Sequence, residues 1–369
     1  MIRPVAKNRG IHKRMWDDST VTKSSGDAAR GAEDALVERS GESPLIGVIS
    51  NINATRNRQR MGKLRARLAT LPGVIHYELA QVEEISQALA LFAACGVRMI
   101  AINAGDGTVQ ATISLLHRDK PFRERIPPIA VLAGGKTNLI ARDLGTHGRP
   151  ERVLARLAAL ARHPDGLKAA LVRRSTIAVS GHEGDGSLGG MFFGLAGVAS
   201  GIRWARRRIH PLGLPDGIEN ALAILMLATS TLVPGHSPLV PQPARILIDG
   251  ERWIEGRFTV ILATTVARLL FGLRLMPHAG EGIQFCAVEP GGMRLLKGLW
   301  ALIRGRLHRA RFPGIHVDRA RRIEIQTSGL FVIDGEYYPI ARQGRLKLEA
   351  TPPLAFVSLR REKGRGSRR

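Results

Sequence analysis

The feature that most constrains this chain is the alternation of short apolar runs with longer amphipathic stretches between Leu45 and about Arg162. This alternation is typical of strand–helix units built around a parallel sheet. Strands are predicted at Leu45–Ser50, Val74–Leu79, Arg98–Ile102 and Ile129–Leu132. Helices are predicted where apolar residues recur at three- and four-residue spacing, at Met61–Leu71, Val82–Cys95 and Val109–Leu116. The fold class expected here is an α/β domain of the nucleotide-binding type.

After about Leu171 the apolar segments become short, and turns that contain Gly, Pro or Asp separate them. This rhythm predicts a mostly antiparallel second domain. Its expected strands are Leu171–Val179, Arg245–Ile248, Phe258–Thr264, Arg322–Ile325, Leu330–Ile333 and Leu346–Leu348. Helix-like stretches interrupt it at Gly197–Arg208, Ile218–Leu232 and Met293–Arg304.

The chain has 369 residues, more than one hydrophobic core usually supports, so two domains are expected. The predicted divisions are a mobile leader at 1–43, the α/β domain at 44–165, the β-rich domain at 166–359 and a basic tail at 360–369. The leader lacks helical or strand periodicity, and the tail combines basic residues with Gly and Ser, which is typical of solvated segments.

The charge of the chain calls for a polyanionic partner: 55 Lys plus Arg stand against 31 Asp plus Glu, a net charge of +24. Nucleic acid and anionic lipid attract such a chain by the same Coulomb physics. Only 5% of the residues are aromatic, and no strand interleaves basic with stacking residues, so a membrane is favoured and nucleic acid is not expected. Two stretches combine Trp with arginines, Ile202–Ile209 and Trp300–Arg311, and suit a membrane interface; the alternative is that Trp enters the core while the arginines stay solvated.

Cysteine usage and hydropathy indicate the compartment. Cys95 and Cys286 have no CxxC partner or nearby histidine pair, so neither a disulfide framework nor a zinc site is indicated. The longest apolar run, Ala221–Val233, is too short to cross a bilayer. The chain is therefore expected to be cytoplasmic and peripherally membrane-associated.

The strongest local motif is Asn-Ala-Gly-Asp-Gly-Thr at 103–108, between a predicted strand and a predicted helix. Glycines let backbone amides approach phosphate oxygens, and the helix N-terminus adds its dipole. The candidate nucleotide-binding residues are Gly105, Asp106, Gly107 and Thr108, with Asp106 also the candidate magnesium ligand. The plainer alternative is a tight turn in which Asp106 caps the helix.

A second glycine loop follows the next predicted strand, at Ala133–Asn138. Parallel strands end at one edge of a sheet, where ligands bind, so both loops are expected to meet there. The residues that would complete the phosphate site are Gly134, Gly135, Thr137 and Asn138. Lys136 could neutralise phosphate charge, although most loop lysines are simply solvated.

Together with Ser50-Asn51 after the first strand, these loops resemble the catalytic domain of the diacylglycerol kinase family, including its bacterial lipid kinases. The resemblance extends through Ala141-Arg142-Asp143-Leu144-Gly145 to Asp334-Gly335-Glu336. It implies an α/β nucleotide domain followed by a β-sandwich-like domain, with ATP and Mg²⁺ meeting the lipid hydroxyl between them. It also adds Asn51 to the nucleotide-binding residues.

The same resemblance gives the late Asp-Gly-Glu a catalytic role: Asp334 would accept or orient the acceptor proton, and Glu336 would help to position metal or substrate. Without the resemblance, Asp-Gly is a common hairpin dipeptide. The chain departs from the family pattern at Ala104, Leu139 and Ile52, and in the segment Pro277–Gln284, where most carboxylates of a family magnesium site are missing.

The implied function is ATP- and Mg-dependent phosphorylation of a lipid hydroxyl, diacylglycerol or a related lipid, by direct in-line transfer. The partners expected are the lipid substrate and an anionic membrane surface, with a homodimer left open. Two alternatives stay open: an NAD-kinase-like enzyme with a soluble acceptor, and a non-catalytic nucleotide- or lipid-binding member of the family.

Overall fold

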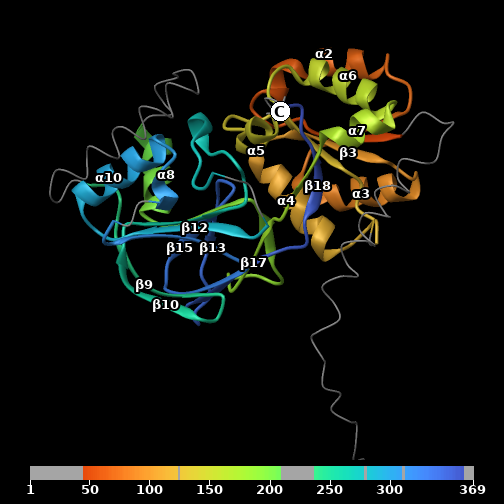
Figure 1. Ribbon diagram of the computed structural model, residues 1–369. Helices are drawn as coiled ribbons and strands as arrows, with labels where there is room; N and C mark the ends of the chain where they lie inside the picture. Colours follow the sequence, from red (N-terminus) through yellow and green to blue (C-terminus); the bar gives the residue numbers. More distant parts are fainter. Residues whose placement is uncertain (1–44, 124, 209–236, 278–280, 310–311, 361–369) are drawn as a thin grey trace, which may run out of the picture. The chain divides into compact units, whose positions relative to one another are not determined.

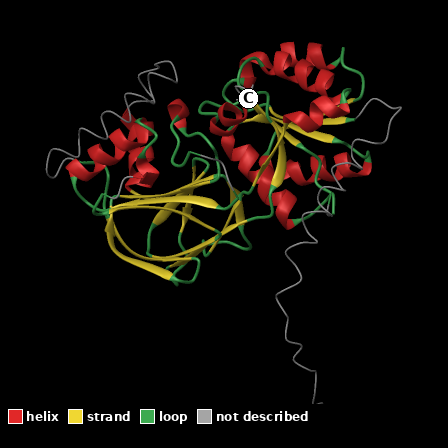
Figure 2. Ribbon diagram, in the orientation of Figure 1, coloured by secondary structure: helices red, strands yellow, loops and turns green. Residues whose placement is uncertain are grey.

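A mostly parallel sheet covered by helices on both faces is built mainly from the N-terminal part of the chain (Figures 1 and 2). The protein is described from a computed structural model, which covers 45–360 apart from 124, 209–236, 278–280 and 310–311. The predicted leader at 1–43, the predicted helix Ile218–Leu232 and the tail beyond 360 lie outside these residues. Among the residues covered, no helix is both long and apolar enough to cross a bilayer.

The four predicted strands of the first domain are confirmed within one or two residues. They are β1 (Ile46–Asn51), β2 (Val74–Leu79), β3 (Met99–Ala104) and β4 (Ile129–Ala133), all parallel, in the order β2-β1-β3-β4. Every residue of β3 and β4 is buried, as expected for strands covered on both faces. This explains why these strands read as continuous apolar runs.

Helices cover the two faces of this sheet because successive strand residues point to opposite sides. One face carries α3 (Ile85–Ala94), α4 (Asp106–Arg118) and α5 (Leu139–Leu144), packed on Ile49, Ile102 and Val131 among others. The other carries α2 (Asn57–Leu68) and α6 (Pro150–Ala161), packed on Val48, Ala101 and Leu132. A short helix, α7 (Pro164–Ala170), follows α6.

The second part of the chain forms two antiparallel sheets. One has the order β10-β9-β14-β17-β6-β7 and the other β13-β12-β11-β8-β15-β16. Their strands are β6 (Ile177–Ser180), β7 (Leu188–Gly190), β8 (Phe192–Ala196), β9 (Gln242–Ile248), β10 (Arg252–Phe258), β11 (Val260–Thr264), β12 (Ile283–Val288), β13 (Ile315–Ala320), β14 (Arg322–Gln326), β15 (Leu330–Ile333), β16 (Glu336–Pro339) and β17 (Arg345–Ala350). One apolar core joins residues of both sheets, such as Ile246 and Ile323 with Phe193 and Phe285, so they form a β-sandwich. The predicted fold class is confirmed.

Two helices accompany the sandwich, α8 (Gly197–Arg208) and α10 (Gly292–Ile303), at the positions predicted from periodicity. Helix α8 contacts β8, β11 and β15, whereas α10 contacts β12. Both helices therefore lie against the sheet that carries the β15–β16 hairpin.

The predicted strand Leu171–Val179 is wrong in one respect: it is two strands in different sheets. Strand β5 (Leu171–Arg174) joins the first sheet beside β18 (Leu354–Val357), which pairs with β4, whereas β6 belongs to the sandwich. The chain passes between the two sheets twice, after β5 and before β18. These two connections are hydrogen-bonded to each other: the Thr176 amide donates to Thr351 Oγ1 at 2.9 Å, and the Thr351 amide donates to the Thr176 carbonyl at 2.9 Å. The first sheet thus includes strands from far along the chain, and the predicted domain limits stay a prediction.

Candidate functional site

The carboxyl ends of β1, β3 and β4 bring the three predicted nucleotide-binding segments to one edge of the sheet. Asn51 ends β1, Gly105 follows β3 and Gly134 follows β4. The side-chain amide of Asn51 donates to Thr108 Oγ1 at 2.9 Å, and its oxygen accepts the Asn53 amide at 2.8 Å. Asn51 and Thr108 thus lie together, as expected, with Asn51 linking the first strand to the start of α4.

The start of α4 has the features of an anion site. Gly105 is the N-cap residue of this 13-residue helix, and no side chain caps it. Gly105, Asp106 and Gly107 are half-buried. Because the first amides of a helix have no partner within it and its dipole favours negative charge, a phosphate group suits this position.

The alternative that Asp106 caps α4 does not describe the structure. Asp106 Oδ2 instead accepts the Leu139 amide at 3.1 Å, at the start of α5. Burial raises the pKa of Asp106, while amides of the α5 N-terminus and Arg142 act in the opposite direction. Asp106 therefore joins the first glycine loop to the second. Leu139 contributes to this link through its backbone amide, although its side chain is not the Asp of the family pattern.

The glycines of the second loop are required by the packing of the two loops. A Cβ on Gly135 would lie 2.5 Å from Gly105 Cα, and one on Gly134 would lie 2.8 Å from the Ala104 nitrogen. Real Cβ atoms do not approach backbone this closely. The loops therefore touch backbone to backbone, which sequence reasoning had not foreseen when it assigned these glycines to phosphate access alone.

Asn138 closes the second loop. It adopts the left-handed conformation with φ of 50°, and its Oδ1 accepts the Gly135 amide at 2.8 Å while Nδ2 donates to the Gly135 carbonyl at 2.6 Å. The side chain is buried and engaged within its own loop. Asn138 thus shapes the loop, whereas Thr137 is exposed beside it.

Asp334 and Gly335 form the two-residue turn between β15 and β16, with φ of 47° and 96°. Two positive φ values are those of a type I′ hairpin turn, which Asp-Gly favours. The Asp334 carboxylate is buried, with Oδ1 accepting the Phe192 amide at 2.9 Å and Oδ2 the Met191 amide at 3.0 Å. Desolvation, followed by the negative charge of Asp106, raises the pKa of Asp334 to about 8.

Glu336 is the carboxylate that reaches the first glycine loop. It is exposed, and a Cβ on Gly107 would lie 3.0 Å from Glu336 Oε1. Two residues further, Tyr338 contacts Gln110 of α4 at 3.5 Å, and burial followed by the charges of Glu336 and Asp334 raises the pKa of the Tyr338 phenol. The structure therefore gathers Asp106, Asp334 and Glu336 at the start of α4.

A buried polar network below the loops was missed by sequence reasoning. Asn57 Nδ2 donates to the carbonyls of Asn51 and Asn103, each at 2.8 Å. Ser50 Oγ lies 2.9 Å from His76 Nε2, and His76 Nδ1 lies 3.6 Å from Glu78. This order resembles a Ser-His-Glu arrangement, but Ser50 has 0% exposure, so no substrate can reach it. The network supports the ends of β1 and β3.

The segment Pro277–Gln284 is described only in part, since 278–280 lie outside the structure. Gln284 is buried and bonds to the Met276 amide and the Val266 carbonyl. Glu281 is exposed. Throughout the part of the chain that is described, no group of three or more His, Cys, Asp or Glu side chains is arranged to hold a metal by itself.

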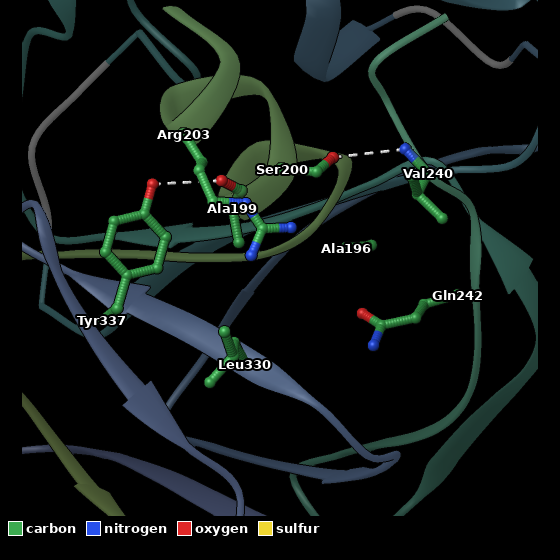
Figure 3. Close-up of a pocket in the computed structure, with 8 residues that line it drawn as sticks. All are labelled: Ala196, Ala199, Ser200, Arg203, Val240, Gln242, Leu330 and Tyr337. Carbon is green, nitrogen blue, oxygen red and sulfur yellow. Dashed lines mark hydrogen bonds between the residues drawn. The ribbon is translucent and has the colours of Figure 1, made fainter. Parts of the chain in front are cut away.

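A cavity of about 210 Å³ lies elsewhere on the sandwich, between α8, the start of β9 and the β15–β16 hairpin (Figure 3). Tyr337 Oη donates to the Ala199 carbonyl at 3.2 Å at its edge, and the Val240 amide donates to Ser200 Oγ at 3.2 Å. Glu336 and Tyr337 are consecutive strand residues, so their side chains point to opposite faces. The cavity is therefore on the face of β16 away from the glycine loops.

Comparison with known proteins finds a family similarity in the first part of the chain and a similar fold over most of it. Residues 46–172 match the family model "Diacylglycerol kinase catalytic domain". Three solved structures from Bacillus anthracis strain Sterne, two provisionally assigned as a diacylglycerol kinase and one described as such, are similar in fold, with TM-scores of 0.61, 0.57 and 0.54. They are 17%, 17% and 15% identical, and each alignment covers 86% of this chain and 98% of the other. No curated protein matches the chain.

Proposed function

Because residues 46–172 match the family model of the diacylglycerol kinase catalytic domain, as the sequence resemblance predicted, we propose that the chain transfers the γ-phosphate of ATP to a lipid hydroxyl. The observation that carries the proposal is the position of Glu336 against Gly107, at the uncapped start of α4. A phosphate-binding helix end and an accessible carboxylate at one point are the two groups that direct phosphoryl transfer needs, one for charge and one for the acceptor proton.

The residues at this edge fit ATP and magnesium. The free amides at the start of α4 would hold phosphate oxygens, with Asn51 and Thr108 fixing the helix start. Magnesium usually binds through one or two carboxylates together with substrate phosphates, so Asp106 would be enough to hold it without a closed cage. When bound, magnesium neutralises charge on the transferred phosphate.

The two carboxylates of the Asp-Gly-Glu motif would take different parts. Asp334 uses both oxygens on the amides of Met191 and Phe192, which supports a positioning role: it anchors the hairpin to β8. Glu336 is exposed beside the loop, so we assign it the contact with the acceptor hydroxyl. This divides the roles differently from the sequence expectation, in which Asp334 had the proton.

The acceptor is proposed to be a lipid, diacylglycerol or a related lipid, on an anionic membrane. The family description and the net charge of +24 support this choice. An NAD-kinase-like reaction on a soluble acceptor is the alternative, and binding without turnover is the other.

The experiment is transfer of radiolabelled phosphate from ATP, with magnesium, to mixed lipid vesicles and separately to NAD. Wild type is compared with Glu336→Gln and Asp106→Asn, and with Glu255→Gln as a control carboxylate that is exposed on β10 and paired with Arg245 at 3.0 Å. Labelled lipid from wild type and the control, but not from the two site variants, is the expected result. Label in NAD instead would establish the soluble-acceptor alternative, and ATP binding with no labelled product would establish the non-catalytic one.

A further inference from the structure

The outer face of α10 exposes more apolar surface than its own packing explains. Met293, Trp300 and Ile303 are 60%, 58% and 57% exposed, and they follow one another at spacings of seven and three residues. Such spacings place side chains along one side of a helix. Three large apolar side chains therefore form an exposed ridge along one side of α10.

The opposite face of α10 already fills its place in the fold. Gly298 and Ala301 are buried, and Ala301 packs in a core with Cys286, Val288 and Ile315 of the sandwich. Folding of the described chain does not use the ridge. An exposed apolar ridge of this kind is typical of a surface that binds something else.

Basic residues lie beside the ridge, and acidic ones are absent from this stretch of the sequence. Between Gly292 and Arg309 there are five Lys or Arg and no Asp or Glu. The exposed Lys297 is on α10 and the exposed Arg304 directly follows its last residue, with its guanidinium 4.3 Å from the centre of the Trp300 ring. Arg306 and Arg309, also exposed, follow the helix. The face thus combines apolar insertion with positive charge.

The other Trp-containing basic stretch has a different environment. Trp204 of α8 is half-buried, so its ring is partly used within the fold. Trp253 of β10 is 53% exposed under Arg245, 5.4 Å away, but Arg245 is paired with Glu255 at 3.0 Å and no ridge accompanies it. Among the described residues of the two stretches that sequence reasoning left open, only those of α10 present a Trp to solvent together with other exposed apolar residues.

We propose that the outer face of α10, formed by Met293, Trp300 and Ile303 with Lys297, Arg304 and Arg306, docks on an anionic lipid bilayer. The charge pattern favours a bilayer as the partner. A bilayer surface has negative headgroups above an apolar layer, and these complement arginines that lie beside an apolar ridge. Trp prefers the headgroup level, and Met and Ile would enter the acyl boundary. The proposal deepens the proposed function by naming the surface that brings the enzyme to its lipid.

The test is co-sedimentation of the full chain with vesicles of phosphatidylcholine alone or mixed with phosphatidylglycerol, at rising salt. We expect binding to the mixed vesicles that salt weakens. Arg304→Gln with Arg306→Gln removes two charges and should weaken it about 30-fold. Trp300→Ala with Ile303→Ala should weaken it by more than about tenfold. The matched control is Trp253→Ala, which also removes an exposed Trp under an arginine and should bind like wild type.

Unfolding curves and size-exclusion chromatography accompany each variant. Wild-type binding by both α10 variants, or an equal loss in Trp253→Ala, would overturn the proposal. So would a dimer that only the α10 variants dissociate, because a second copy would then cover the face. Kinase turnover is measured separately on acceptor dispersed in neutral detergent, where the α10 variants should match wild type. Loss of docking without any turnover in wild type would leave this proposal standing while the proposed function fails.

Discussion

Two regions meet at the candidate site, and they are held in place in different ways. The glycine loops are fixed by neighbours close in sequence: Asn138 bonds to Gly135 three residues away, and Asp106 bonds to the Leu139 amide 33 residues away. The Asp334–Glu336 hairpin is anchored by amides 142 and 143 residues earlier in the chain. The loops are therefore a local device for phosphate, whereas the carboxylates reach them only through the tertiary fold of the sandwich.

The largest effect expected from this division falls on Glu336. Replacing it by Gln removes the proposed proton acceptor but little packing, since the side chain is exposed. We expect kcat to fall by about 10² to 10⁴, equivalent to about 3–5 kcal/mol on the barrier, with the free energy of unfolding within about 0.5 kcal/mol of wild type. Steady-state kinetics and chemical denaturation measure the two quantities.

Asp334→Asn complements that experiment, and it should lower the free energy of unfolding more than it lowers kcat. The buried amides of Met191 and Phe192 share one remaining acceptor, so stability falls by about 1–3 kcal/mol. Should Glu336→Gln retain wild-type kcat while Asp334→Asn loses it without loss of stability, the roles assigned to the two carboxylates would have to be exchanged.

The next effect tests the contact between the loops. Gly135→Ala places a Cβ 2.5 Å from Gly105 Cα, so one loop must move. We expect a loss of about 3 kcal/mol in the free energy of unfolding together with weaker ATP binding, measured by denaturation and calorimetry. The control is Gly62→Ala on α2, where the new methyl group meets nothing within 4 Å and should stabilise by up to about 1 kcal/mol. Equal stability of both variants would refute the backbone-to-backbone packing.

The pH dependence of stability probes the hairpin anchor. The folded-state pKa of Asp334, about 8, exceeds the ordinary value, so the folded protein holds a proton that the unfolded chain has lost. The free energy of unfolding should therefore fall as pH rises from 5 to 8, by an amount on the order of 4 kcal/mol from this group. Asp334→Asn should show a smaller fall, and Asp106, whose pKa is also raised, should supply part of the remainder. Parallel slopes for wild type and variant would show that Asp334 is ionised throughout.

The same contrast explains how much of the fold the sequence could predict. Strands β1, β3 and β4 could be predicted because both faces are buried and the residues read as continuous apolar runs, whereas β2 is a half-buried edge strand. The break at Ser175–Thr176 was missed, because an apolar segment does not reveal that two successive parts join different sheets. The return of β18 to the first sheet was missed for the same reason: strand pairing is set by long-range contacts.

The residues of the candidate site also fall into those that the sequence could predict and those that it could not. Glycine loops after strands, and Asp-Gly between strands, have local signatures, so sequence predicted where they would be. Asn57 gave no such signal, since its bonds to Asn51 and Asn103 exist only once β1 and β3 pair. On α10, periodicity predicted a helix but not that Trp300 faces solvent while Trp204 is half-buried.

The smallest effect concerns Ala104, where the family pattern has glycine. Ala104 is a regular β3 residue paired with Ala133, it is not among the described residues with positive φ, and its methyl group is buried. Ala104→Gly should therefore leave kcat and the KM for ATP within about twofold and lower the free energy of unfolding by less than about 1 kcal/mol, because glycine is entropically unfavourable in a strand. Kinetics of the two proteins side by side decide the matter. A tenfold gain in activity would mean that the Ala104 methyl group hinders the approach of phosphate and that a third glycine is needed there. The sequence of the loops would then be set by access of ATP to the backbone rather than by the packing of one loop on the other.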